Sequence, residues 1–148
     1  MLHMAGKCGL YCGACSIYIA QRDSAKLRAQ IASDFNCGED QVRCNGCGDL
    51  TSECWGNGCA IVLCTRARGV DYCFECPDYE NKTCEKFAKL ANNYLENGVD
   101  LADNLKQIKA GKVEDWLQQC KERFSCQACG KPFTVHEVAC WHCGNKTR

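Results

Sequence analysis

The sequence predicts a small mixed, mainly α protein: a metal-stabilised, cysteine-rich helical domain followed by a C-terminal four-cysteine zinc ribbon built on a β-hairpin. Three observations predict this fold. The chain has 17 cysteines among 148 residues, above the roughly 8–10% that marks small disulfide scaffolds. Apolar residues recur at helical spacing in several segments, whereas the end of the chain carries two C-x2-C pairs, each followed by glycine. We expect the two domains at residues 1–122 and 123–148.

The spacing of the cysteines favours metal binding over disulfides. A C-x2-C pair turns both thiolates to the same side of a tight turn, as a tetrahedral ion requires. Disulfides need an oxidising compartment, and the N-terminal segment lacks the apolar stretch of an export signal. The five pairs are Cys12/Cys15, Cys44/Cys47, Cys73/Cys76, Cys126/Cys129 and Cys140/Cys143.

Charge and hydropathy narrow the possible partners. Acidic and basic residues balance at 18 each, so no overall field attracts nucleic acid or an anionic membrane. No apolar run reaches the roughly 18 residues that would span a bilayer. We therefore expect a cytoplasmic protein without a membrane partner. Nothing in the sequence indicates an oligomeric state.

The first cysteine group lies in the segment CGLYCGAC and consists of Cys8, Cys12 and Cys15. Radical enzymes hold a four-iron cluster with this C-x3-C-x2-C spacing. Such enzymes usually carry an aromatic residue before the third cysteine, where this chain has Ala14, and they fold as partial barrels of strand–helix units, which do not follow here. We expect the three cysteines to bind one metal centre, completed by a cysteine within residues 44–84.

Helical periodicity first appears just after this group. A stripe of residues spaced by three and four predicts one helix over residues 17–35, ended by Gly38. Cysteine-rich turns follow up to residue 84, interrupted by a short helix at residues 59–68 that ends at Gly69. Few residues there can form an apolar core, so metal ligands must organise the segment. The candidate ligands are Cys44, Cys47, Cys54, Cys59, Cys64, Cys73, Cys76 and Cys84, whereas Cys37 is excluded because it belongs to no close pair.

Three further helices are predicted before the ribbon. The first covers residues 84–96 with Thr83 as its cap, the second covers residues 100–110 and ends at Gly111, and the third covers residues 113–124. Cys120 lies on the apolar face of the third helix and has no close cysteine partner. Since buried free cysteine is common, we interpret it as a core residue.

The ribbon is the most specific pattern in the chain. Cys126, Cys129, Cys140 and Cys143 form two knuckles around a ten-residue spacer, and four thiolates complete the tetrahedral shell of one ion. Rubredoxin-type iron uses the same knuckles, but the frequency of zinc ribbons and the coordination preference of zinc favour zinc. Because the thiolates already complete the shell, His136 and His142 are expected to be surface or packing residues.

The order of the cysteines resembles a known family, the prokaryotic, cysteine-rich domain of unknown function numbered 3795. Its members open on a CGLYCGAC-like sequence and continue through C-x-G-C, cysteines around a short helix and YC-x-EC to one further cysteine. The resemblance covers about residues 5–120. This chain carries extra residues between Cys54 and Cys59 and between Cys76 and Cys84, and it lacks the usual proline before the last cysteine. The resemblance implies metal binding without a known reaction, and an anaerobic setting that suits iron–sulfur clusters.

The leading functional hypothesis is a zinc-binding structural adapter or accessory protein with several zinc ions and another protein as its partner. Closed four-thiolate sites leave no position for a substrate, and no Ser/His or Cys/His couple has credible spacing, so the sequence favours a protein that is not an enzyme. The alternative is an iron–sulfur electron-transfer or cluster-carrier protein, with a 4Fe-4S cluster on Cys8, Cys12, Cys15 and a remote cysteine.

A weaker alternative is nucleic-acid binding through the ribbon. Basic and aromatic residues that cluster on a surface can contact phosphates and stack on bases. The neutral chain as a whole argues against this partner, and a solvated tail explains the charges better. The residues concerned are Lys121, Arg123, Lys131, Trp141, His142, Lys146 and Arg148.

Overall fold

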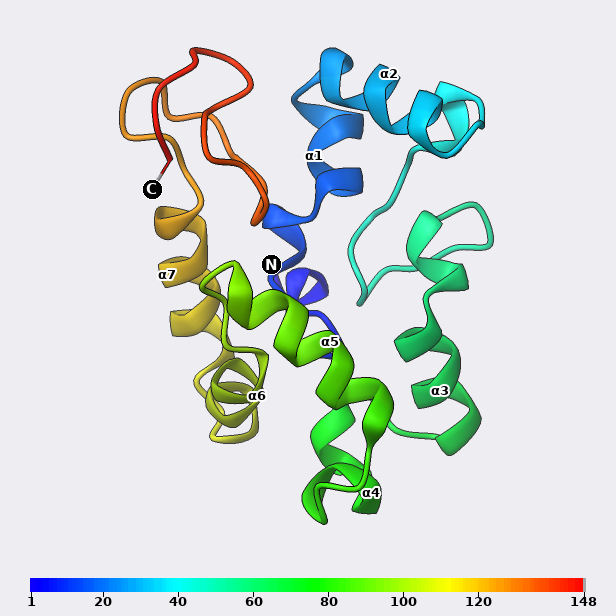
Figure 1. Ribbon diagram of the computed structural model, residues 1–148. Helices are drawn as coiled ribbons and strands as arrows, with labels where there is room; N and C mark the ends of the chain where they lie inside the picture. Colours follow the sequence, from blue (N-terminus) through cyan, green and yellow to red (C-terminus); the bar gives the residue numbers. More distant parts are fainter. Residues whose placement is uncertain (148) are drawn as a thin grey trace.

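A computed structural model describes residues 1–147 and contains seven α-helices joined by short turns (Figure 1). The mainly α fold expected from the sequence is confirmed. None of the helices in the described part of the chain is long and apolar enough to cross a membrane. The helices are α1 (Ser16–Arg22), α2 (Ala25–Asp34), α3 (Ala60–Arg68), α4 (Pro77–Glu80), α5 (Glu85–Glu96), α6 (Leu101–Lys109) and α7 (Val113–Arg123).

The boundaries differ from the predicted ones at two places. The helix expected over residues 17–35 is split into α1 and α2, because the Ser24 side chain accepts a hydrogen bond from the Leu27 backbone N–H at 3.2 Å and so caps a new helix. Helix α5 is capped by the Cys84 sulfur and not by Thr83. The predicted stop of α3 at Gly69 is confirmed.

One main core joins the N-terminal segment, helices α5 to α7 and the C-terminal segment. Trp116 of α7 is its largest fully buried side chain, at 2% exposure. Phe133 and Val135 of the C-terminal segment belong to the same core, and the Val135 N–H donates to the Ala14 carbonyl at 3.2 Å. The division at residue 122 stays a prediction, and Arg148 lies outside the described residues.

A smaller core lies between α1, α2 and the segment that follows them. It contains Ile19, Leu27, Ile31 and Val42, and Trp141 of the C-terminal segment packs against it. Figure 1 shows α1 and α2 beside the C-terminal segment, at the end of the molecule away from α4. The C-terminal segment therefore contacts both cores.

Helices α6 and α7 hold the first cysteine loop in place. The Trp116 indole N–H donates to Asn104 Oδ1 at 3.0 Å, and Asn104 Nδ2 donates to the Gly9 carbonyl at 2.9 Å. Gly9 has φ of +87°, and a Cβ there would lie 2.6 Å from the Leu101 carbonyl oxygen. The loop between Cys8 and Cys12 thus packs directly on the start of α6.

Gly9→Ala is expected to destabilise the protein by at least about 1–2 kcal/mol, because alanine is strained at positive φ and its Cβ would clash with α6. Chemical denaturation followed by circular dichroism measures the effect. Gly58→Ala is the matched control, since nothing lies within 4 Å of its Cβ position and its φ is not in the positive region. Equal stability of the two variants would contradict the packing of the loop on α6.

Candidate metal centres

All 17 cysteines are free thiols, and most of them gather at three places. The C-terminal site consists of Cys126, Cys129, Cys140 and Cys143. The large cavity is lined by Cys8, Cys12, Cys15, Cys44, Cys47 and Cys59. The small cavity is lined by Cys64, Cys73, Cys76 and Cys84.

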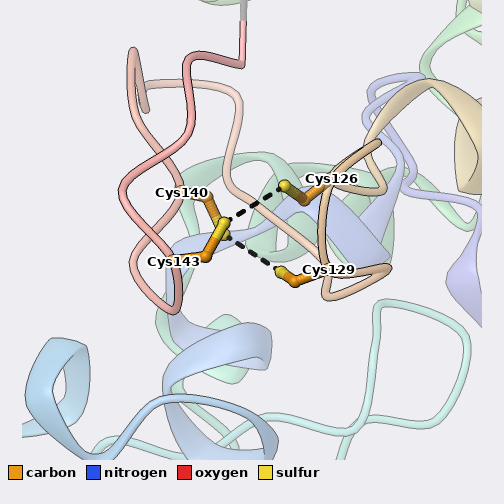
Figure 2. Close-up of side chains that lie close together, drawn as sticks. All are labelled: Cys126, Cys129, Cys140 and Cys143. Atoms are coloured by element: carbon orange, nitrogen blue, oxygen red, sulfur yellow. Dashed lines mark hydrogen bonds between the residues drawn. The ribbon is translucent and has the colours of Figure 1, made fainter.

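The four sulfurs of the C-terminal site are arranged as they would be around one tetrahedrally coordinated ion (Figure 2). The sulfurs of Cys126 and Cys143 lie 3.6 Å apart, those of Cys129 and Cys140 lie 3.7 Å apart, and all four lie within 4.8 Å of one another. Four thiolates at about 2.3 Å from one ion stand about 3.8 Å from each other. The predicted four-cysteine group is therefore confirmed, and it can hold a metal ion.

The two knuckles of this site have the same backbone structure. In each knuckle the first cysteine's carbonyl accepts a hydrogen bond from a glycine N–H, at 2.8 Å for Gly130 and 2.9 Å for Gly144. Both glycines have positive φ, 73° and 75°, which turns the next backbone N–H toward the second cysteine of the pair, Cys129 or Cys143. Such N–H groups stabilise thiolates and orient them toward a metal.

Backbone dipoles favour the thiolate form of Cys126, the first cysteine of the first knuckle. The N–H groups of Cys129 and Ala128 lower the pKa of Cys126 to about 7, below the ordinary thiol value of 9.0. A thiolate that is already stabilised by the backbone is prepared to bind a cation.

The expected β-hairpin of the ribbon is not shown in the described part of the chain. Each knuckle is instead closed by one isolated antiparallel bridge, Ser125 to Pro132 and Ala139 to Lys146. The segment between the knuckles is held by the buried carboxylate of Glu137, which accepts hydrogen bonds from the N–H groups of Thr134 and Trp141. These side-chain contacts take the place of a strand ladder.

The large cavity brings the first cysteine group next to the second. It has a volume of 580 Å³, and its cysteines come from the N-terminal loop, the turn at residues 44–47 and the residue before α3. Leu90 and Tyr94 of α5 form part of its apolar wall. Within residues 1–147, only the C-terminal site has three or more potential ligand atoms within 4.8 Å of one another. The sulfurs around the large cavity are therefore more widely spaced.

Burial opposes free thiolates at the large cavity, whereas the Cys47 thiol has a pKa shifted below its ordinary value. Burial raises the pKa of Cys8 far above its ordinary value. Cys12 and Cys47 interact directly: the Cys47 N–H donates to the Cys12 sulfur at 3.3 Å. The hydrogen bond between their side chains, together with burial, raises the pKa of Cys12, and the same bond lowers that of Cys47 to about 7. Ionising more than one of these sulfurs requires a compensating cation.

The small cavity is lined by cysteines from α3 and from the turns around α4. Its volume is 40 Å³. Burial and the neighbouring charges of Cys84, Cys64 and Cys76 raise the pKa of Cys73 to about 12. The four sulfurs are thus close enough to interact electrostatically.

Comparison with protein families identifies the segment that contains the cysteines of both cavities. The model of the family described as "Protein of unknown function (DUF3795)" matches residues 4–89. The chain belongs to the DUF3795 family. The match ends inside α5, short of the expected residue 120, and the C-terminal site lies outside it. Comparisons with curated proteins and with solved structures gave no match.

Three cysteines lie outside the groups that line the two DUF3795 cavities and the C-terminal site. Cys54 is buried, accepts a hydrogen bond from the Thr51 N–H at 3.3 Å and interacts with Cys44 at the edge of the large cavity. Cys37 lines a separate surface hollow. Cys120 is buried in the main core, as predicted. Whether each sequence-predicted cysteine binds metal stays a prediction.

Sequence reasoning did not identify Arg68, Tyr94 and Glu137, which line the cavities or hold the segment between the knuckles. Arg68 is the last residue of α3, and its Nη1 donates to the Cys76 sulfur at 3.0 Å. The sequence does contain a signal for this role: Arg68 stands four residues after Cys64, and residues i and i+4 share a helix face, so Arg68 is expected near the same cysteine group. Tyr94 and Glu137 carry no comparable signal, since their contacts depend on the tertiary structure.

Two residues of the basic and aromatic set near the C-terminus take part in contacts within the chain. Arg123 Nη2 donates to the Gly98 carbonyl at 2.5 Å. The Trp141 ring lies against the smaller core with Lys26 Nζ 5.5 Å from its centroid. These contacts give both residues a structural role.

Proposed function

We propose that this DUF3795 protein is a zinc-binding structural adapter or accessory protein, whose C-terminal site holds one zinc ion. The observation that carries the proposal is the group of four sulfurs within 4.8 Å, arranged by two matching knuckles. Zinc is favoured over mononuclear iron because four-thiolate tetrahedral sites are its common structural form. Four thiolates complete the coordination shell and leave no position for a substrate.

The surroundings of the site support a structural role. Phe133 and Val135 follow the first knuckle directly and pack into the main core, so metal binding positions core residues. Val138, at 73% exposure between the two knuckles, is an apolar side chain available to a partner protein. We propose another protein as the partner on this basis.

The test is the metal content of protein purified without oxygen. We expect one zinc ion per chain to be lost in Cys129→Ser and retained in Cys37→Ser, the control that touches none of the three groups. Iron lost from the Cys129→Ser variant in place of zinc would contradict the zinc assignment. Unchanged metal content would remove the site altogether.

A second candidate function is iron–sulfur electron transfer or cluster carriage through the large cavity. Six cysteines with widely spaced sulfurs surround one apolar cavity of 580 Å³, which suits a polynuclear cluster better than one ion. We propose a 4Fe-4S cluster on Cys8, Cys12 and Cys15, with a fourth thiolate from Cys44, Cys47 or Cys59.

Cys12→Ala tests this candidate. We expect the anaerobically purified wild type to be brown and the variant to lose about four irons per chain, with its zinc retained. Unchanged iron would remove Cys12 from the ligands. Reductive cleavage of S-adenosylmethionine by the wild type, lost in the variant, would favour a radical enzyme over electron transfer.

A further inference from the structure

We propose that the small cavity is a separate metal centre, in which Cys64, Cys73, Cys76 and Cys84 hold a 4Fe-4S cluster and Arg68 donates a hydrogen bond to a ligand sulfur. The proposal extends the iron–sulfur candidate to a second centre. It uses none of the residues of the large cavity or of the C-terminal site, so it stands or fails independently of both.

The four cysteines converge from separate elements of the fold. Cys64 lies on α3, Cys73 begins a 3-10 turn at Cys73–Glu75, Cys76 precedes α4, and Cys84 caps α5. All four line the same cavity. Cys73 and Cys76 share one turn, and the fold brings Cys64 and Cys84 to it.

The spacing of the four sulfurs favours a cluster over a single ion, because within residues 1–147 three or more ligand atoms lie within 4.8 Å of one another only at the C-terminal site. One ion contacts all four thiolates and leaves no space between them, as the spacing at the C-terminal site illustrates. The small cavity instead retains 40 Å³, whereas one water needs about 10–15 Å³. In a four-iron cluster each thiolate binds its own iron, and the sulfides occupy the centre.

The polar groups at the cavity match an anionic occupant. Arg68 Nη1 lies 3.0 Å from the Cys76 sulfur, while Nη2 forms an ion pair with Asp78 Oδ2 at 2.5 Å that orients the guanidinium. The Phe87 N–H donates to the Cys84 sulfur at 3.4 Å, at the positive end of the twelve-residue helix α5. Both donors stabilise negative charge on the sulfurs.

The rest of the cavity wall excludes other occupants. Besides the cysteines, the wall consists of Ile61, Thr65, Arg68, Val70, Tyr79 and Lys86. The Thr65 hydroxyl already donates to the Val62 carbonyl, and Arg68 is engaged with Cys76 and Asp78, so few polar groups remain to orient an organic ligand. Small-molecule sites usually exceed about 300 Å³. A compact inorganic group held by thiolates is what the cavity can accommodate.

Arg68 has a specific consequence for redox behaviour. A hydrogen bond to a ligand sulfur stabilises the more negative, reduced cluster and raises its reduction potential. The cluster takes one electron from an added donor such as dithionite and returns it on reoxidation, without making or breaking a ligand bond. Replacing Arg68 by a side chain without N–H donors should therefore lower the potential without releasing iron.

The experiment compares full-length variants purified without oxygen. Cys73→Ser and Cys64→Ala are each expected to lose about four irons and four sulfides per chain, while zinc and the cluster that depends on Cys12 remain. Cys64→Ala keeps a strong helix former on α3, so circular dichroism of this second variant separates loss of the cluster from loss of the fold. Loss of zinc in place of iron, or unchanged iron in both variants, would overturn the proposal.

Arg68→Met and Arg66→Met form the matched pair for the hydrogen bond. Arg66 lies on the same helix but donates to Asn57 Oδ1 at 2.7 Å. Redox titration followed by electron paramagnetic resonance should show a lower midpoint potential for Arg68→Met alone, with iron content unchanged. Equal potentials in the wild type and Arg68→Met would overturn the role assigned to Arg68.

Discussion

Cys140→Ser is expected to release the metal ion of the C-terminal site and to abolish hydrogen-exchange protection around both knuckles. The variant replaces a thiolate by a neutral hydroxyl, which is a poor zinc ligand. Metal binding contributes about 10–16 kcal/mol to folding in isolated zinc modules. The knuckles themselves have only a few backbone hydrogen bonds, in turns and two isolated bridges, so little else holds them in place. The residues between 126 and 147 should therefore lose protection together.

Metal analysis and hydrogen exchange followed by mass spectrometry measure these effects, with Cys37→Ser as the control. We expect helices α5 to α7 to remain folded, because Trp116, Leu105 and Leu117 are buried among these helices. Loss of the far-ultraviolet helix signal would show instead that the contacts of Phe133 and Val135 make one cooperative unit of the whole chain, against the predicted division at residue 122.

Trp116→Ala is expected to lower the free energy of unfolding by about 3–5 kcal/mol, the usual cost of removing a buried aromatic side chain. Trp116 fills the main core and anchors Asn104, which in turn holds the Gly9 carbonyl. Loss of the indole should therefore also loosen the loop of Cys8 and Cys12. Urea denaturation measures the stability, and hydrogen exchange of residues 6–15 reports on the loop.

Trp116→Phe separates the two contributions of the indole. The phenyl ring retains most of the buried volume but leaves Asn104 Oδ1 without its donor, which costs less than the roughly 1–3 kcal/mol of a fully buried acceptor because Asn104 is half-buried. We expect Trp116→Phe to loosen the loop while destabilising the protein less than Trp116→Ala. Unchanged exchange in both variants would show that the loop is held by other contacts.

The C-terminal site could be predicted from the sequence because its geometry is local. Cys126 and Cys129 stand in one turn, Cys140 and Cys143 in another, and a glycine after each pair allows the backbone to face the sulfurs. The same holds for the helices that end at Gly69 and Gly111, where a positive φ stops the helix. The break at Ser24 was not predicted, because the helical spacing of apolar residues continues across it. In the sequence, one serine that can cap a helix is a weaker signal than this continuous pattern.

The sequence by itself therefore determined the mainly α fold, the resemblance to the DUF3795 family and the four-cysteine group of the C-terminal site, since turns, caps and helical stripes depend on neighbouring residues. Only the tertiary structure decided how the remaining cysteines are shared between the large and the small cavity. Cys8 and Cys59, or Cys64 and Cys84, meet because separate elements pack together. The contacts of Arg68 with Cys76 and of Asn104 with Gly9 have the same origin. The positions of these residues in the sequence do not show how close they lie in space, because that distance is set by the way the helices pack around the core.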